Sequence, residues 1–176
     1  MVLKILLVVA ILLGVFLITA AFQSEDFKIE RSVLITAPAD KIFPLVNDLK
    51  AFDQWNPFLV RDPKVKVIYD GPSSGIGMSS TWNGNDQLGA GKNTIVESHP
   101  NELVGMRLDF ERPMKTTNSV IFTFKPQVEG TLVTWSMSGK KNYMAKIFNM
   151  LMNMDKVVGG EFEAGLSNLK VVVEKK

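Results

Sequence analysis

An uninterrupted run of hydrophobic residues opens the chain, and it extends without a charge over residues 5–22. As a helix this run would be roughly 27 Å long, close to the hydrocarbon thickness of a bilayer. A secretory signal peptide is the alternative, although its apolar region is usually shorter and Thr19-Ala20-Ala21 is only a passable cleavage site. We predict an uncleaved membrane anchor over residues 1–24, followed by a separate domain over residues 25–176.

Charges on the two sides of the run predict its orientation. Lys4 precedes it, and Glu25 and Asp26 follow it. Because positively charged flanks stay in the cytoplasm, we expect a single-pass protein of the cell membrane with its domain outside the cytoplasm.

Short segments of alternating apolar and polar residues follow, each ended by turn residues. In one of them Val104 and Met106 share a face, while Arg107 and Asp109 occupy the other. Such alternation predicts an antiparallel sheet that is covered on one side. The predicted strands comprise residues 27–36, 65–69, 78–83, 91–98, 103–110, 119–125 and 131–138, the sixth ending near Pro126.

Two regions have helical spacing instead. After Ala37-Pro38, Asp40 is the expected N-cap of the first of two short helices, and the second contains Phe52 and Trp55. Near the C-terminus, apolar residues recur every three or four positions over residues 144–173, which predicts one long amphipathic helix. Its glycines at positions 159, 160 and 165 indicate a kink or a close approach to the sheet.

The order of these elements resembles the helix-grip fold of the SRPBCC superfamily, which includes START, Bet v 1 and polyketide cyclase/dehydrase-like proteins. Ala37-Pro38, Trp55-Asn56-Pro57-Phe58, Trp82-Asn83-Gly84 and Thr134-Trp135 make the chain most similar to the polyketide cyclase/dehydrase-like branch. The resemblance implies an α+β fold, in which a curved antiparallel sheet of about seven strands wraps around a long C-terminal helix. It also implies an apolar cavity between them for a lipid-like or polycyclic ligand.

Large aromatic and methionine side chains are expected to face that cavity, because such side chains adapt to varied apolar ligands. A packed core is the alternative for each of them. Asp53, Asn83 and Tyr143 are further candidates as polar anchors. The candidate ligand-binding residues are Trp55, Phe58, Tyr69, Trp82, Met106, Phe110, Phe122, Phe124, Trp135, Met137 and Met154.

Composition narrows the chemistry. The apolar fraction of 46% falls to about 40% once the N-terminal run is set aside, and the formal net charge is +2. Without a basic cluster we expect no nucleic-acid partner. The absence of cysteine excludes thiol catalysis and thiolate metal sites, and a single histidine, His99 in a predicted turn, excludes a histidine-rich metal site. We therefore expect no metal or cofactor and assign no catalytic residue.

These observations lead to one functional hypothesis and two alternatives. We expect a membrane-anchored domain that binds a hydrophobic small molecule or lipid in an internal cavity, as a carrier or sensor. A polyketide cyclase or dehydratase-like enzyme could use the same cavity. A non-catalytic interaction module would instead have a fully packed core.

Overall fold

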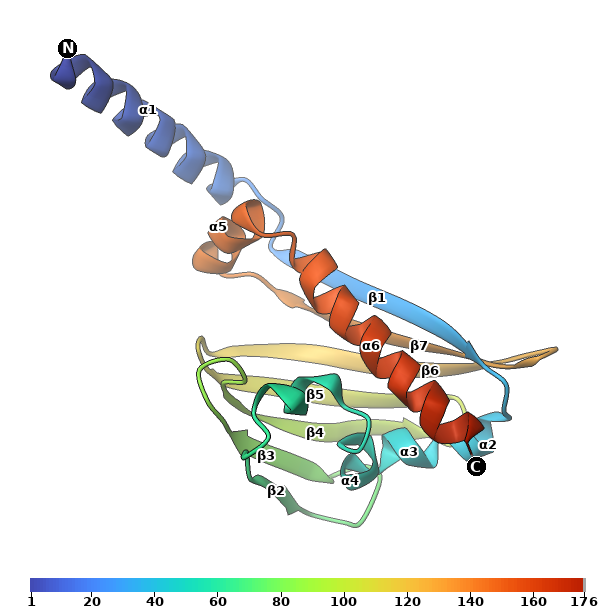
Figure 1. The fold of residues 1–176 in the computed structure, drawn as a ribbon. Coiled ribbons are helices and arrows are strands. Elements are labelled where there is room, and N and C mark those ends of the chain that lie inside the picture. Colours follow the sequence, from blue (N-terminus) through green and yellow to red (C-terminus); the bar gives the residue numbers. More distant parts are fainter. Residues whose placement is uncertain (176) are drawn as a thin grey trace.

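The computed structural model describes residues 1–175. A seven-stranded sheet forms the body of the domain, and a long helix lies across one of its faces (Figure 1). The helices are α1 Val2–Ala21, α2 Ala39–Ile42, α3 Pro44–Asn47, α4 Leu49–Phe52, α5 Tyr143–Leu151 and α6 Met154–Glu174, with a 3₁₀ turn, η1, at Pro57–Arg61. The strands are β1 Asp26–Ile35, β2 Val67–Asp70, β3 Ser79–Asn83, β4 Ala90–His99, β5 Leu103–Arg112, β6 Thr116–Gln127 and β7 Gly130–Lys140.

Strands β2 to β7 form an antiparallel meander, and β1 pairs with β7 at the edge of the sheet. Its spatial order is β1-β7-β6-β5-β4-β3-β2, and every neighbouring pair is antiparallel. Lys140 at the end of β7 lies opposite Asp26 at the start of β1. The register of β4 against β5 shifts between Ile95 and Glu97, which is an irregularity of the kind that bends a strand. The predicted helix-grip fold is confirmed.

Helix α6 packs closely against the sheet because glycines occupy its inner face. A Cβ atom at Gly165 would lie 2.7 Å from the Trp135 ring and 2.9 Å from Pro57, and one at Gly159 would overlap the Arg31 guanidinium. Gly160, by contrast, faces open space. The helix runs unbroken from Met154 to Glu174, and Gly159 and Gly165 both mark a close approach to the side chains beneath them.

The prediction of one helix over residues 144–173 was wrong, because the segment forms α5 and α6. Met152 has extended backbone dihedral angles and ends α5. The Asn153 side chain then caps α6 by accepting a hydrogen bond from the Lys156 N–H at 3.0 Å. An Asn in that position satisfies a free N–H of a new helix, which favours a restart over continuation.

Smaller corrections concern the ends of elements. Asp40 does not cap the first short helix: Pro38 occupies that position and Asp40 lies inside α2. Three short helices replace the predicted two because the first divides at Phe43, after which Pro44 begins α3. The boundary before α4 is at Asp48, whose side chain accepts from the Lys50 N–H at 2.8 Å. The sixth strand ends near Pro126 as predicted, at Gln127, but it begins three residues earlier than expected, at Thr116.

Aromatic side chains fill one end of the space between sheet and helices. Phe52 of α4 and Trp55 after it meet Phe122 of β6 edge to face, at centroid distances of 5.9 and 6.0 Å. The Trp55 indole N–H donates to the Leu45 carbonyl at 3.0 Å, which satisfies its one polar atom. Phe43 packs on Phe124 in the same way at 5.8 Å. We call this group of rings the aromatic plug.

Helix α1 projects from the domain as a separate rod (Figure 1). It has 20 residues with a mean hydropathy of 2.9, and it is long and apolar enough to cross a bilayer. A signal sequence near the N-terminus can meet the same criteria of length and composition. Its C-terminal end contacts α5, where Ala20 is fully buried.

Candidate functional site

A cavity of about 360 Å³ occupies the end of the concave face that the aromatic plug leaves free. Its volume lies in the range of small-molecule sites, roughly 300–1,000 Å³. The sheet forms its floor, the N-terminal half of α6 its roof, and η1 with the β3–β4 and β5–β6 connections its rim. It is lined by Phe52, Asp53, Asn56, Phe58, Leu59, Arg61, Val67, Ser80, Trp82, Gln87, Leu88, Asn93, Met106, Leu108, Phe110, Arg112, Pro113, Val120, Trp135, Met137, Met154, Val158 and Phe162.

Seven of the eleven predicted ligand-binding residues line this cavity. They come from η1, β3, β5, β7 and α6, which the fold brings together from distant parts of the chain. Trp135 stacks on Phe162 with centroids 4.2 Å apart and planes inclined by 9°, while Trp82 meets Phe110 edge to face at 5.9 Å. The seven are Phe58, Trp82, Met106, Phe110, Trp135, Met137 and Met154.

The other four predicted residues lie outside the lining, and the aromatic plug explains three of them. Phe122 and Phe124 belong to the apolar face of β6, as their parity indicated, but Phe52, Trp55 and Phe43 cover them. Trp55 is itself part of that cover. Tyr69 lies in a separate small depression beside Lys50.

Three polar atoms of the lining residues are buried without a hydrogen-bond partner. They are the indole N–H groups of Trp82 and Trp135 and the side-chain oxygen of Asn93. Asn93 and Trp135 are 8% and 3% exposed, and the Asn93 amide N–H₂ already contacts the Met106 sulfur at 3.3 Å. A buried polar group without a partner costs about 1–3 kcal/mol.

Asp53 is the one acidic residue among the residues that line the cavity. Its carboxylate accepts hydrogen bonds from the Tyr69 O–H at 2.8 Å and from the Asn56 amide at 3.2 Å. Burial raises the pKa of Asp53, against the opposing effect of these two bonds. Burial, and then the bond to Asp53, also raises the pKa of Tyr69. The sequence placed both residues among the candidates but did not indicate that they form a pair.

Ion pairs hold the rim. Arg61 pairs with Glu161 of α6 at 2.7 Å. Arg112 donates to the side-chain oxygen of Asn83 at 2.7 Å, so this candidate anchor is already occupied and exposed. Glu163, two residues further along α6, instead pairs with Arg31 at 2.6 Å, so the Glu161 and Glu163 carboxylates point in different directions.

The remaining candidates lie away from the cavity. His99 is exposed at the end of β4 and its Nε2 contacts Glu97 at 2.9 Å. Tyr143 lies on α5, where its O–H donates to the Leu17 carbonyl of α1 at 2.9 Å. Within residues 1–175, no group of three or more His, Asp or Glu side chains is arranged to hold a metal ion.

Comparison with known proteins decides the family. A family model described as polyketide cyclase/dehydrase and lipid transport matches residues 26–174. The chain belongs to this family. The match begins with β1 and ends with α6, so it covers the sheet, the cavity and the long helix and leaves α1 outside. The predicted family is confirmed, and its description supports a ligand-binding domain.

Solved structures of this family's fold extend the likeness at low sequence identity. A protein from Mesorhizobium loti is 13% identical with a TM-score of 0.63, and the alignment covers 85% of this chain and 98% of that one. The di-domain ARO/CYC StfQ from the steffimycin biosynthetic pathway is 12% identical with a TM-score of 0.65, over 86% of this chain and 51% of its own. Ara h 8.0201 is 11% identical with a TM-score of 0.60, over 86% and 99%. No curated protein matches the chain.

Proposed function

We propose that residues 25–176 form a binding domain that holds a hydrophobic small molecule or lipid, as a carrier or sensor, and that residues 1–24 anchor it in the cell membrane. The cavity carries this proposal. Its volume of about 360 Å³ suits a ligand of this class, and its lining is apolar apart from a few polar groups. Trp82, Trp135 and Asn93 line the cavity, and if these side chains turned toward a ligand their unpartnered atoms would offer it two donors and one acceptor. We expect a largely apolar ligand with at least one hydrogen-bond acceptor.

The anchor and its orientation rest on α1. About 20 residues of helix span roughly 30 Å, the thickness of the hydrocarbon core. Lys4 precedes the apolar segment and Glu25 follows it, which favours a domain outside the cytoplasm. Anchoring places the cavity beside the phase into which an apolar ligand partitions.

Native mass spectrometry of the purified full-length chain tests the proposed function. We expect a non-covalent adduct that survives removal of the detergent, and a higher melting temperature after membrane lipid extract is added. The Val158→Phe variant fills the cavity and should lose the adduct. Val171→Phe, on the exposed side of the same helix, is the matched control and should keep it. A uniformly empty chain whose melting temperature does not respond to the extract would refute the proposal.

A second candidate function, a cyclase or dehydratase-like enzyme, rests on Asp53. A buried carboxyl group with a raised pKa in a ligand-sized cavity is suited to proton transfer. His99 and Tyr143 lie outside the cavity, so Asp53 is the acid or base to test first. Turnover of a polyketide-like substrate that Asp53→Asn left unchanged would exclude this role. The cavity also counts against the third alternative, an interaction module with a packed core.

A further inference from the structure

Helix α5 carries an exposed apolar face that the domain does not cover. The stripe recurs at the spacing of one helix face and continues into the break before α6. Elsewhere in the domain, exposed large hydrophobic residues such as Val60, Ile68 and Val128 are scattered singly. The members of the α5 face, with their exposed fractions, are Tyr143 (45%), Met144 (51%), Phe148 (48%), Leu151 (67%) and Met152 (51%).

Contacts fix this face beside the C-terminal end of α1. The Tyr143 O–H donates to the Leu17 carbonyl at 2.9 Å. The Lys146 ammonium, almost fully buried, lies 3.4 Å from the Glu25 carboxylate, and the Lys141 N–H donates to the Glu25 carbonyl at 2.7 Å. Leu17 lies four residues before the end of α1, which is roughly 6 Å along its axis. The α5 face therefore lies level with the last turn of the apolar helix.

We propose that α5 is an interfacial helix whose apolar face is buried in the bilayer that α1 spans. The inference rests on the anchor of the proposed function. Interfacial helices lie about 5–10 Å deep at the boundary of headgroups and acyl chains, the depth at which Leu17 holds Tyr143. Lys140 and Lys141 precede α5 and suit the phosphates of anionic headgroups. Because the apolar face of α5 lies beside the apolar helix α1, the same bilayer that surrounds α1 would cover it.

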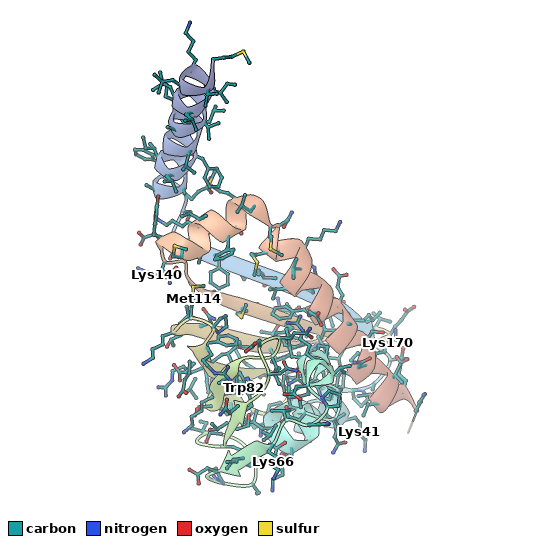
Figure 2. The ribbon with its side chains drawn as sticks, turned by 60° about the vertical axis from the view of Figure 1, so that its left-hand side comes forward. Lys41, Lys66, Trp82, Met114, Lys140 and Lys170 are labelled. Atoms are coloured by element: carbon teal, nitrogen blue, oxygen red, sulfur yellow. The ribbon has the colours of Figure 1, made fainter. Side chains whose placement is uncertain are left out.

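With α5 buried in the bilayer interface, one part of the cavity rim would lie next to the membrane. Asn118 of β6 lies opposite Gly139 of β7, so the β5–β6 connection lies at the same end of the sheet as the start of α5. Figure 2 shows Met114 of that connection close to Lys140. Arg112 and Pro113 at this connection are exposed and line the cavity, as does Met154 directly after the α5–α6 break. The part of the cavity rim that these three residues form therefore lies at the end of the sheet that carries α5.

Site-directed spin labelling tests the inference, and the absence of cysteine means that each label needs one substitution. The full-length chain is reconstituted in vesicles of phosphatidylcholine and phosphatidylglycerol, with a nitroxide at Phe148→Cys or Leu151→Cys. The matched control is Val128→Cys, in the exposed β6–β7 turn at the opposite end of the sheet. Collision rates with oxygen, which concentrates in lipid, and with a water-soluble nickel chelate are compared. We expect an oxygen-to-nickel ratio several-fold higher at positions 148 and 151 than at position 128.

Two results would overturn the inference. A ratio at positions 148 and 151 equal to that of the control would show that α5 lies in water. Low access to both reagents, with spin–spin broadening between chains, would show that a second copy covers the face. A label at Leu12→Cys separates these failures from failure of the anchor, because it reports lipid whenever α1 spans the bilayer. Ligand occupancy, measured by mass spectrometry, is independent of all four labels.

Discussion

Gly165 tests how closely α6 is held against the sheet. Replacing Gly by Ala in a helix interior stabilises it by about 1 kcal/mol, because the more flexible glycine loses more backbone entropy on folding. At Gly165, however, the new Cβ would lie 2.7 Å from the Trp135 ring and 2.9 Å from the Pro57 ring. Trp135 is stacked on Phe162 and Pro57 is buried, so neither ring moves freely. Overpacking of this kind costs about 1–3 kcal/mol.

Gly160 supplies the matched control in the same helix. A Cβ atom there meets nothing within 4 Å, so Gly160→Ala should show the helix-propensity gain alone. The difference between the two variants isolates the steric cost, because the propensity contribution is common to both. At about 2–4 °C per kcal/mol for a domain of this size, Gly165→Ala should melt roughly 2 to 12 °C below Gly160→Ala.

Thermal unfolding followed by circular dichroism of the full-length chain in detergent measures this difference. We expect the order Gly160→Ala, wild type, Gly165→Ala from highest to lowest melting temperature whenever the steric cost exceeds about 1 kcal/mol. Equal melting temperatures for the two variants would mean that α6 lies farther from Trp135 than the structure shows, and the reasoning would be refuted.

Three further substitutions test the plug, the cavity floor and the buried acid. The pKa of Asp53 is raised from 3.8 in the folded chain, so the folded chain binds a proton more readily than the unfolded chain. As pH rises from 3.8 through the raised pKa of the folded state, the wild type should therefore lose stability relative to Asp53→Asn. If the melting temperatures of the wild type and of Asp53→Asn changed in parallel with pH, this prediction would be contradicted. Trp55→Phe leaves the Leu45 carbonyl without its donor and should cost about 1–3 kcal/mol in urea unfolding. Met106→Ala should cost about 2–5 kcal/mol while enlarging the cavity, measured by unfolding and by the mass of the bound adduct; an unchanged stability would place Met106 outside the core.

The strands could be predicted from sequence because their causes are local. Alternation fixes which side chains share a face, and turn residues fix where a strand ends, so all seven strands lay within a few residues of their expected positions. The break before α6 was missed because the apolar spacing continues through it. An Asn at position 153 becomes a cap only when the backbone of Met152 is extended, and the apolar pattern does not report that change.

The site was harder to predict, because the alternation of side chains along a strand shows which face a residue occupies but not what covers that residue. Phe122 and Trp135 both belong to the inner face, and Phe52 and Trp55 pack edge to face on both of them, yet only Trp135 also lines the cavity. That outcome depends on where α4 and the chain after it settle, which is a long-range packing result. The unpartnered oxygen of Asn93 is equally invisible in the sequence, because polarity alone does not reveal a missing partner.

The aromatic plug and the cavity share one concave face, and Phe52 belongs to both. The plug has its polar atom satisfied and its rings interlocked, so substitutions there act on folding. In the cavity, Met106, Trp135 and Phe162 are likewise buried, whereas rim residues such as Gln87 and Pro113 are exposed, so a change of size there alters the shape of the cavity without disturbing the packed core. Ligand preference can therefore change through residues at the rim, while the plug and the buried floor of the cavity keep the same folded frame.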